Sequence, residues 1–159
     1  RDQATLPLFK MVRNRLHFKP GFKAKQYSYV AVSDLVEAIL SALDADWSAL
    51  KQRYFFVASE EPVTDEQLIS QAAIASSTKG YLLRIPQPIL KGVSRVVDNI
   101  PTWRATIPTL SADRAKEIWP DRWVISPKGF QKQFNWKPIA KFETALSETH
   151  DWYSRTGQI

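Results

Sequence analysis

Two hydrophobic periods meet in one stretch near the start of the chain, and together they constrain its fold. Residues 27–32 are aromatic, β-branched or small and include no charge, Gly or Pro, which is typical of a strand buried on both faces. Beyond Asp34 the apolar residues follow the spacing of one broad helical stripe: Leu35, Val36, Ile39, Leu40 and Leu43. A buried strand that runs directly into a helix predicts an α/β fold with a covered sheet.

The joint between the two periods carries a helix-capping signal. The Asp34 side chain can accept hydrogen bonds from the amides of the first helical turn, and Glu37 follows three residues later, as in a capping box. We therefore expect Asp34 to be the N-cap of a helix over residues 34–43.

A second strand and helix follow in the same order. Residues 53–58 carry little charge and predict a strand, while Thr64 and Gln67 predict a capping box for a helix that stops near Gly80. Consecutive units of this kind form right-handed parallel crossovers. We expect strand 27–32 to pair in parallel with strand 53–58, with helix 34–43 crossing between them.

The other predicted elements are shorter. Apolar spacing predicts a helix within residues 4–15, Pro20-Gly21 predicts a turn, and residues 81–85 predict a short strand. Frequent prolines divide the rest of the chain, where helices are expected over 88–100, from Ser126-Pro127 onward, and over 139–153. The length of 159 residues fits one domain.

The net charge of +6 comes entirely from residues 1–33. This segment holds one acidic and seven basic side chains, the latter being Arg1, Lys10, Arg13, Arg15, Lys19, Lys23 and Lys25. Aromatic residues lie among these cations, as in proteins that bind single-stranded nucleic acid. However, the chain has no ribonucleoprotein motif, no Gly-x-x-Gly loop and no basic run longer than two. The favoured interpretation of this segment is a helix followed by a hairpin with exposed lysines. The alternative hypothesis is a basic binding module for an anionic partner such as single-stranded nucleic acid.

Composition excludes several other classes of site. The chain has no Cys, so it forms no disulfide and no thiolate metal site. His17 and His150 are far apart and are expected at the surface, so no metal ligand is assigned. The sequence contains no apolar run long enough to span a membrane and no signal sequence, so the expected location is cytoplasmic.

Several motifs resemble the extended short-chain dehydrogenase/reductases, the superfamily of NAD-dependent epimerases and dehydratases. Residues 30–39, Val-Ala-Val-Ser-Asp-Leu-Val-Glu-Ala-Ile, resemble a late strand and helix of that family. Residues 110–157 resemble its carboxyl-terminal end through the segments 110–117, 123–128, 134–138 and 148–153, with Gly157 after them. Phe134-Asn135 replaces the usual Leu-Gly, and Asn also tolerates the left-handed conformation. The subgroup most similar is that of 3β-hydroxysteroid dehydrogenase and dihydroflavonol reductase.

The resemblance implies a fragment of a Rossmann-type fold. Residues 1–159 would be a single C-terminal portion, with the last strand-helix units of the nucleotide-binding sheet in 1–85 and a mainly helical substrate-binding lobe in 86–159. The parent protein would use NAD or NADP on a carbonyl or alcohol substrate. The partner of this portion would be the upstream nucleotide-binding half of the same polypeptide, and the oligomeric state is left open.

The chain itself lacks the family's cofactor and catalytic motifs. No two of its five glycines lie within ten residues of each other, so it has no dinucleotide fingerprint. No Tyr is followed four residues later by the Lys of the family's Tyr-x-x-x-Lys pair. We therefore assign no catalytic or cofactor-binding residue here, expect both motifs upstream of Arg1, and expect the isolated chain to bind no nicotinamide cofactor.

The substrate prediction comes from a departure from the family pattern. Tyr27 occupies the position at which nucleotide-sugar epimerases carry a phosphate-binding Arg, and a phenol cannot replace a bidentate cation. We therefore expect an apolar or lightly polar substrate, bound by Tyr27, Trp103 and Arg104 and by apolar walls from the helix over 88–100. Lys25 is close enough in sequence to reach the same region.

Overall fold

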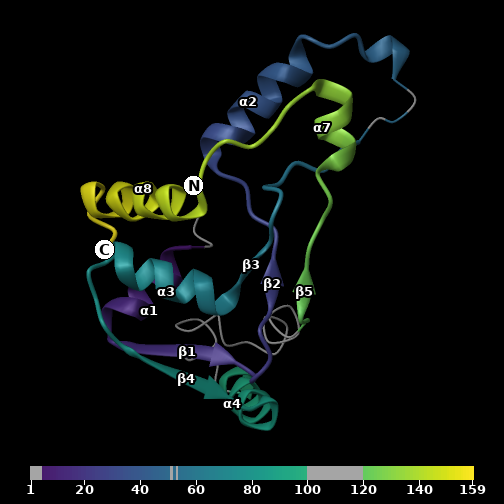
Figure 1. The fold of residues 1–159 in the computed structure, drawn as a ribbon. Coiled ribbons are helices and arrows are strands. Elements are labelled where there is room, and N and C mark those ends of the chain that lie inside the picture. The colour runs from purple at the N-terminus through teal and green to yellow at the C-terminus, as the bar shows by residue number, and fades with distance from the viewer. Residues whose placement is uncertain (1–4, 51, 53, 100–119) are drawn as a thin grey trace.

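A computed structural model describes residues 5–50, 52, 54–99 and 120–159. Its elements, in chain order, are α1 (Leu6–Arg13), β1 (Leu16–Pro20), β2 (Gln26–Tyr27), α2 (Val32–Leu43), the 3-10 helix η1 (Trp47–Ala49), β3 (Val63–Thr64), α3 (Asp65–Ala75), β4 (Tyr81–Ile85), α4 (Gln87–Asn99), β5 (Arg122–Trp123), α7 (Lys128–Phe134) and α8 (Phe142–Arg155). The fold is mixed α/β, as expected from the sequence (Figure 1).

The described strands form two small sheets. β1 and β4 pair in parallel from Leu16 opposite Tyr81 to Pro20 opposite Ile85. In the second sheet β2 lies between β3, which is antiparallel to it, and β5, which is parallel. The sequence predicted β4 and the turn at Gly21, whose φ of 82° is left-handed and which leads from one sheet to the other.

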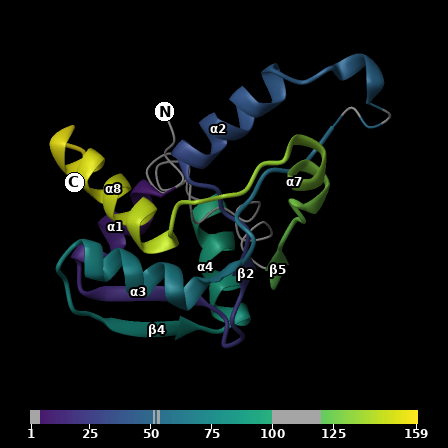
Figure 2. The ribbon, with the colours of Figure 1, turned by 45° about the horizontal axis from the view of Figure 1, so that its top comes forward.

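The larger core lies between α1, α3 and α8, which gather on one side of the molecule (Figure 2). Its buried residues are Phe9, Val12, Ile69, Ala72, Ala73, Leu146 and Tyr153. The rings of Phe9 and Tyr153 meet edge to face at 5.7 Å, and the Tyr153 hydroxyl lies 3.0 Å from Thr5 Oγ1. The predicted capping box is confirmed, because Thr64 Oγ1 accepts from Gln67 N and the Gln67 side chain accepts from Thr64 N.

A smaller core joins α2 to α7. Ala38, Phe130 and Trp136 are buried there, with Ala42, Phe55, Val57 and Phe134 packed against them. Asn135 ends α7 in the left-handed conformation with a φ of 47°, a conformation that Asn tolerates. Ser126 does not cap this helix, because its N-cap is Pro127 and no side-chain cap hydrogen bond forms.

The predicted parallel pair of strands is wrong. Only the first residue of 27–32 belongs to a strand, and the described residues of 53–58 belong to neither sheet. Tyr27 pairs with Val63 in β3 and Trp123 in β5 instead. Ser59, the residue after the second predicted strand, donates from its backbone N to Tyr29 O over 2.7 Å.

Asp34 does not cap α2. The helix begins two residues earlier at Val32, with Ala31 as the N-cap and no side-chain cap hydrogen bond. The buried Asp34 carboxylate instead accepts from the backbone amides of Ile139, at 3.0 Å, and Ala140, at 3.1 and 3.3 Å. It therefore attaches the first turn of α2 to the segment that leads into α8.

Candidate functional site

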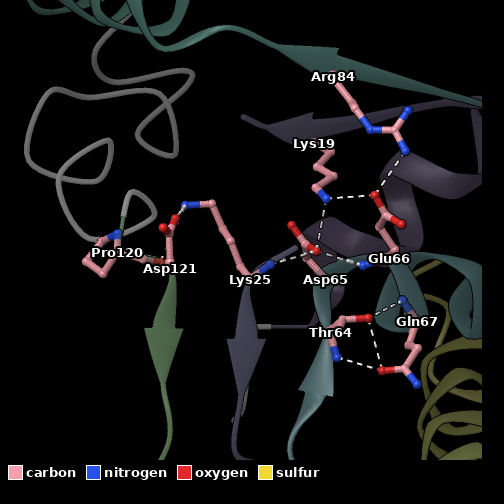
Figure 3. Close-up of polar contacts among 9 residues, drawn as sticks. All are labelled: Lys19, Lys25, Thr64, Asp65, Glu66, Gln67, Arg84, Pro120 and Asp121. Atoms are coloured by element: carbon pink, nitrogen blue, oxygen red, sulfur yellow. Dashed lines mark hydrogen bonds and ion pairs between the residues drawn. The ribbon is translucent and has the colours of Figure 1, made fainter. Parts of the chain in front are cut away.

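A cluster of charged side chains lies where β1, β4 and the start of α3 meet (Figure 3). Lys19 is completely buried, and its Nζ donates to Glu66 Oε1 over 2.7 Å and lies 3.3 Å from Asp65 Oδ1. Arg84 Nη2 donates to the same Glu66 oxygen over 3.0 Å. The prediction that the lysines of this region are exposed is therefore wrong for Lys19, and it is also wrong for Lys25, which is 2% exposed.

Asp65 joins this cluster to β2. Its Oδ1 accepts from the backbone amides of Lys25, at 3.2 Å, and Glu66, at 3.0 Å, while Asp65 N donates to Lys25 O over 3.0 Å. Its Oδ2 is buried and makes no hydrogen bond within the described residues. A buried carboxylate needs compensating positive charge, and Lys19 provides it.

The hydrogen bond from Lys19, followed by that from Arg84, lowers the pKa of the Glu66 carboxyl below its ordinary value. Glu66 therefore remains ionised at neutral pH. Because its negative charge is shared between two cations, we interpret this cluster as a fixed ionic support for the strands rather than a site of proton transfer.

The Lys25 side chain leaves the cluster and runs toward the start of β5 (Figure 3). Its Nζ donates to Pro120 O over 3.4 Å and lies 3.8 Å from Asp121 Oδ1, while Lys23 Nζ lies 3.9 Å from the other oxygen of Asp121. Burial lowers the pKa of the Lys25 ammonium group, and the negative charges of Asp121 and Asp65 partly oppose this effect.

A cavity of about 420 Å³ opens beside Lys25. It is formed by the turn between β1 and β2, the first residues of α4 and the residue before β5, namely Pro20, Gly21, Phe22, Lys23, Lys25, Pro86, Gln87, Pro88 and Asp121. Gly21 N donates to Ile85 O over 2.8 Å, which holds the turn against the end of β4. The cavity therefore offers mainly apolar walls with two cations and one carboxylate, a lining suited to a compact organic molecule with a polar end.

Of the three predicted substrate-binding residues, the structure describes only Tyr27. Tyr27 is half-buried on β2, two residues beyond Lys25, but it does not line this cavity. Burial, and secondarily the charge of Asp65, raise the pKa of the Tyr27 phenol above its ordinary value. Trp103 and Arg104 lie outside the described residues, as does the motif over 110–117. The assignment of all three residues to substrate binding stays a prediction.

Sequence reasoning missed most of the cavity lining. Phe22 and Lys23 follow the predicted Pro20-Gly21 turn, and Pro86 and Pro88 lie at the start of the predicted helix, now α4. Each pair marks a chain reversal beside an element boundary, but nothing in the local sequence indicates that the two boundaries meet. The parallel pairing of β1 with β4 brings them together, over a separation of more than sixty residues.

Burial of Lys19 and Lys25 also bears on the nucleic-acid alternative. Two of the seven cations in the basic segment are buried and form ion pairs with carboxylates of the same chain. They are therefore unable to contact the phosphates of a docked strand, and the alternative loses support.

Within residues 5–50, 52, 54–99 and 120–159, no group of His, Cys, Asp and Glu is arranged to hold a metal ion. In the same residues no helix is long and apolar enough to cross a membrane.

No family model and no curated protein matches the sequence. Solved structures match the fold. A UDP-glucose 4-epimerase from Thermotoga maritima, solved with UDP-glucose, is 15% identical with a TM-score of 0.62, and the match covers 94% of this chain and 38% of the epimerase. A UDP-glucose 4-epimerase from Thermus thermophilus, solved with NAD, is 18% identical with a TM-score of 0.60, and the match covers 97% of this chain and 41% of that one.

A dTDP-glucose 4,6-dehydratase from Bacillus anthracis, solved with NAD, is 14% identical with a TM-score of 0.61, and the match covers 98% of this chain and 40% of the dehydratase. The chain thus spans about two fifths of the length of these neighbours. Similarity at this level of identity concerns structure alone. The chain has the fold of NAD-dependent epimerases and dehydratases over part of their length.

Proposed function

We propose that this chain is the C-terminal, substrate-binding portion of an NAD(P)-dependent epimerase, dehydratase or reductase. The observation that carries the proposal is the fold match, which takes in nearly all of this chain but only about two fifths of each neighbour. The sequence motifs in 30–39 and 123–157 support the same family. The dinucleotide fingerprint and the Tyr-Lys pair would then precede Arg1 in the same polypeptide.

The residues of this chain do not fit a nicotinamide cofactor. A dinucleotide needs closely spaced glycines so that the backbone can approach its pyrophosphate, and the five glycines here are dispersed. Gly80 is also closed to a ligand, since a Cβ there would collide with the His17 ring and would lie 2.6 Å from Arg15 O. The proposed role of this portion is therefore confined to binding and orienting the substrate.

The cavity beside Lys25 supports a substrate that is apolar or lightly polar. Phe22 and three prolines supply apolar walls, and Lys25 is already engaged by Pro120 O and Asp121. A polar end of the substrate, such as a carbonyl or hydroxyl, would contact the exposed Lys23 ammonium group. Tyr27, Trp103 and Arg104 remain the proposed substrate-binding residues from the sequence, and we assign the parent protein a carbonyl or alcohol substrate in preference to a nucleotide sugar.

A substrate panel on the product of the complete reading frame tests this proposal. We expect turnover of steroid or flavonoid ketones with NADH or NADPH to exceed turnover of UDP-sugars. We further expect Phe22→Ala to lower kcat/KM by about tenfold, because an apolar wall of the substrate cavity is lost. Phe18→Ala is the matched control, since Phe18 is partly exposed on β1 and does not line the cavity. Turnover of UDP-sugars well above that of the ketones would overturn the substrate assignment.

A further inference from the structure

A polar pocket of about 270 Å³ lies beside the larger core, where α1, α3 and α8 reach their C-terminal ends. Arg13 is the last residue of α1, Ser76 follows the last residue of α3, and Ser154 lies in the last turn of α8. The complete lining is Arg13, Ser76, Thr78, His150, Ser154 and Ile159. None of these residues lines the cavity beside Lys25, so the pocket is separate from the proposed substrate cavity.

Arg13 gives the pocket a cation that is not used elsewhere in the described fold. It is an exposed member of the basic segment, and its guanidinium group forms no ion pair or hydrogen bond within residues 5–50, 52, 54–99 and 120–159. Two further cations flank the pocket in the sequence, because Lys79 directly follows Thr78 and Arg155 directly follows Ser154. The surroundings of the pocket therefore favour a negatively charged ligand.

His150 adds a second nitrogen-bearing group, and its ring is fixed in position. The ring packs against Phe9 with the two centroids 5.5 Å apart, and its Nδ1 lies 3.3 Å from Asp151 Oδ1. The Asp151 carboxylate offsets part of the positive charge, but it is directed to Nδ1. Nε2 makes no hydrogen bond within the part of the chain that the structure describes. In the protonated ring this nitrogen is a donor for an anion.

Three hydroxyl groups complete the polar lining. Ser76 Oγ is buried and makes no hydrogen bond within the described residues, whereas Thr78 Oγ1 donates to Ala73 O over 3.4 Å and Ser154 is exposed. The negative end of α3 is partly satisfied by its own capping bonds, because Ser76 N donates to Ala72 O and Thr78 N to Ala73 O. A buried hydroxyl without a partner is costly, and Ser76 gains a hydrogen bond by rotating toward a ligand in the pocket.

We propose that this pocket binds a phosphate group, present as inorganic phosphate or in a small phosphate monoester. A phosphate group presents several acceptor oxygens, and the pocket offers a guanidinium group, an imidazole ring and three hydroxyls as donors. A carboxylate, with two oxygens, would use fewer of these donors. The pocket also has room for a short organic part, for which the Ile159 side chain provides an apolar wall.

A phosphate titration of the isotope-labelled 159-residue chain, followed through amide chemical shifts at constant ionic strength, tests the site. We expect the signals of residues 76–78 to shift and to saturate with a Kd of about 1 mM. Arg13→Gln removes the charge and should weaken phosphate binding by at least about tenfold. Lys10→Gln is the matched control, because Lys10 is exposed on the same helix and does not line the pocket. It should change the Kd by less than about twofold.

A third variant tests the buried hydroxyl, and two further probes test the ligand. Ser76→Ala should weaken phosphate binding by about fivefold and leave the melting temperature unchanged, because Ser76 Oγ has no partner within the described residues. Glycerol 3-phosphate distinguishes the two sources of the phosphate group, since tighter binding than that of inorganic phosphate identifies a monoester and weaker binding identifies the free ion. Three results would each overturn the proposal: no saturation at residues 76–78, equal weakening by Arg13→Gln and Lys10→Gln, or tighter binding of acetate than of either phosphate.

Discussion

Replacing Asp65 with alanine is expected to lower the free energy of unfolding by about 3–5 kcal/mol. The change removes the carboxylate beside a completely buried Lys19 ammonium group and leaves that charge with one partner, Glu66, whose side chain is partly exposed. It also removes the acceptor of two backbone amides, those of Lys25 and Glu66. Chemical denaturation of the two proteins measures the difference.

Two further variants show whether the loss arises from Lys19. Asp44→Ala removes an exposed carboxylate at the end of α2 and should change the free energy of unfolding by less than about 0.5 kcal/mol. Adding Lys19→Met to Asp65→Ala should recover part of the stability, because the uncompensated charge is then gone. If Asp65→Ala is no more harmful than Asp44→Ala, the ionic support described for β1 and α3 does not exist.

Replacing Asp34 with alanine should lower the free energy of unfolding by about 2–3 kcal/mol. The buried carboxylate is the acceptor for the amides of Ile139 and Ala140, and hydrogen bonds to a charged acceptor are stronger than those between neutral groups. Loss of an ordinary helix cap would cost about 1 kcal/mol. Glu37→Ala, at an exposed position of the same helix, is the control and should be nearly neutral.

Amide chemical shifts separate the two explanations for Asp34. The long-range contact predicts that Asp34→Ala shifts the signals of Ile139 and Ala140, which are more than a hundred residues away. A cap would shift only the signals of the first turn of α2. Signals at 139 and 140 that do not move would exclude the contact.

Local signals in the sequence predicted the elements that depend on neighbouring residues. The capping box of Thr64 and Gln67 needs only residues three apart, and it forms as expected. Helices α1, α4 and α8 and strand β4 were predicted because their periods lie within each segment. Asn135 adopts the left-handed conformation, which Asn tolerates better than most residues do.

Features that depend on distant partners could not be predicted. Asp34 has the residue type and position of a cap, but its hydrogen bonds go to Ile139 and Ala140. Lys19 and Lys25 were predicted to be exposed because their carboxylate partners, Asp65 and Asp121, lie more than forty residues away in the sequence. The cavity beside Lys25 was missed because it forms only when two element boundaries meet.

The apolar spacing of residues 35–43 predicted the helix α2 but not the exposure of its apolar residues. The apolar spacing correctly indicated a helix, yet α2 keeps most of these apolar residues exposed. Residues 53–58 were predicted as a strand from their low charge, and the described residues among them belong to neither sheet. An apolar pattern indicates that one face of a helix packs against another part of the protein, but it does not identify that part.

Calorimetric titration of NAD and NADP is the most direct measurement of the central claim, that this chain is the substrate-binding portion of a cofactor-dependent enzyme. The 159-residue chain should bind neither cofactor with a Kd below about 1 mM, whereas the product of the complete reading frame should bind one of them at a micromolar Kd. Micromolar binding by the 159-residue chain alone, or no binding by the longer protein, would contradict the account.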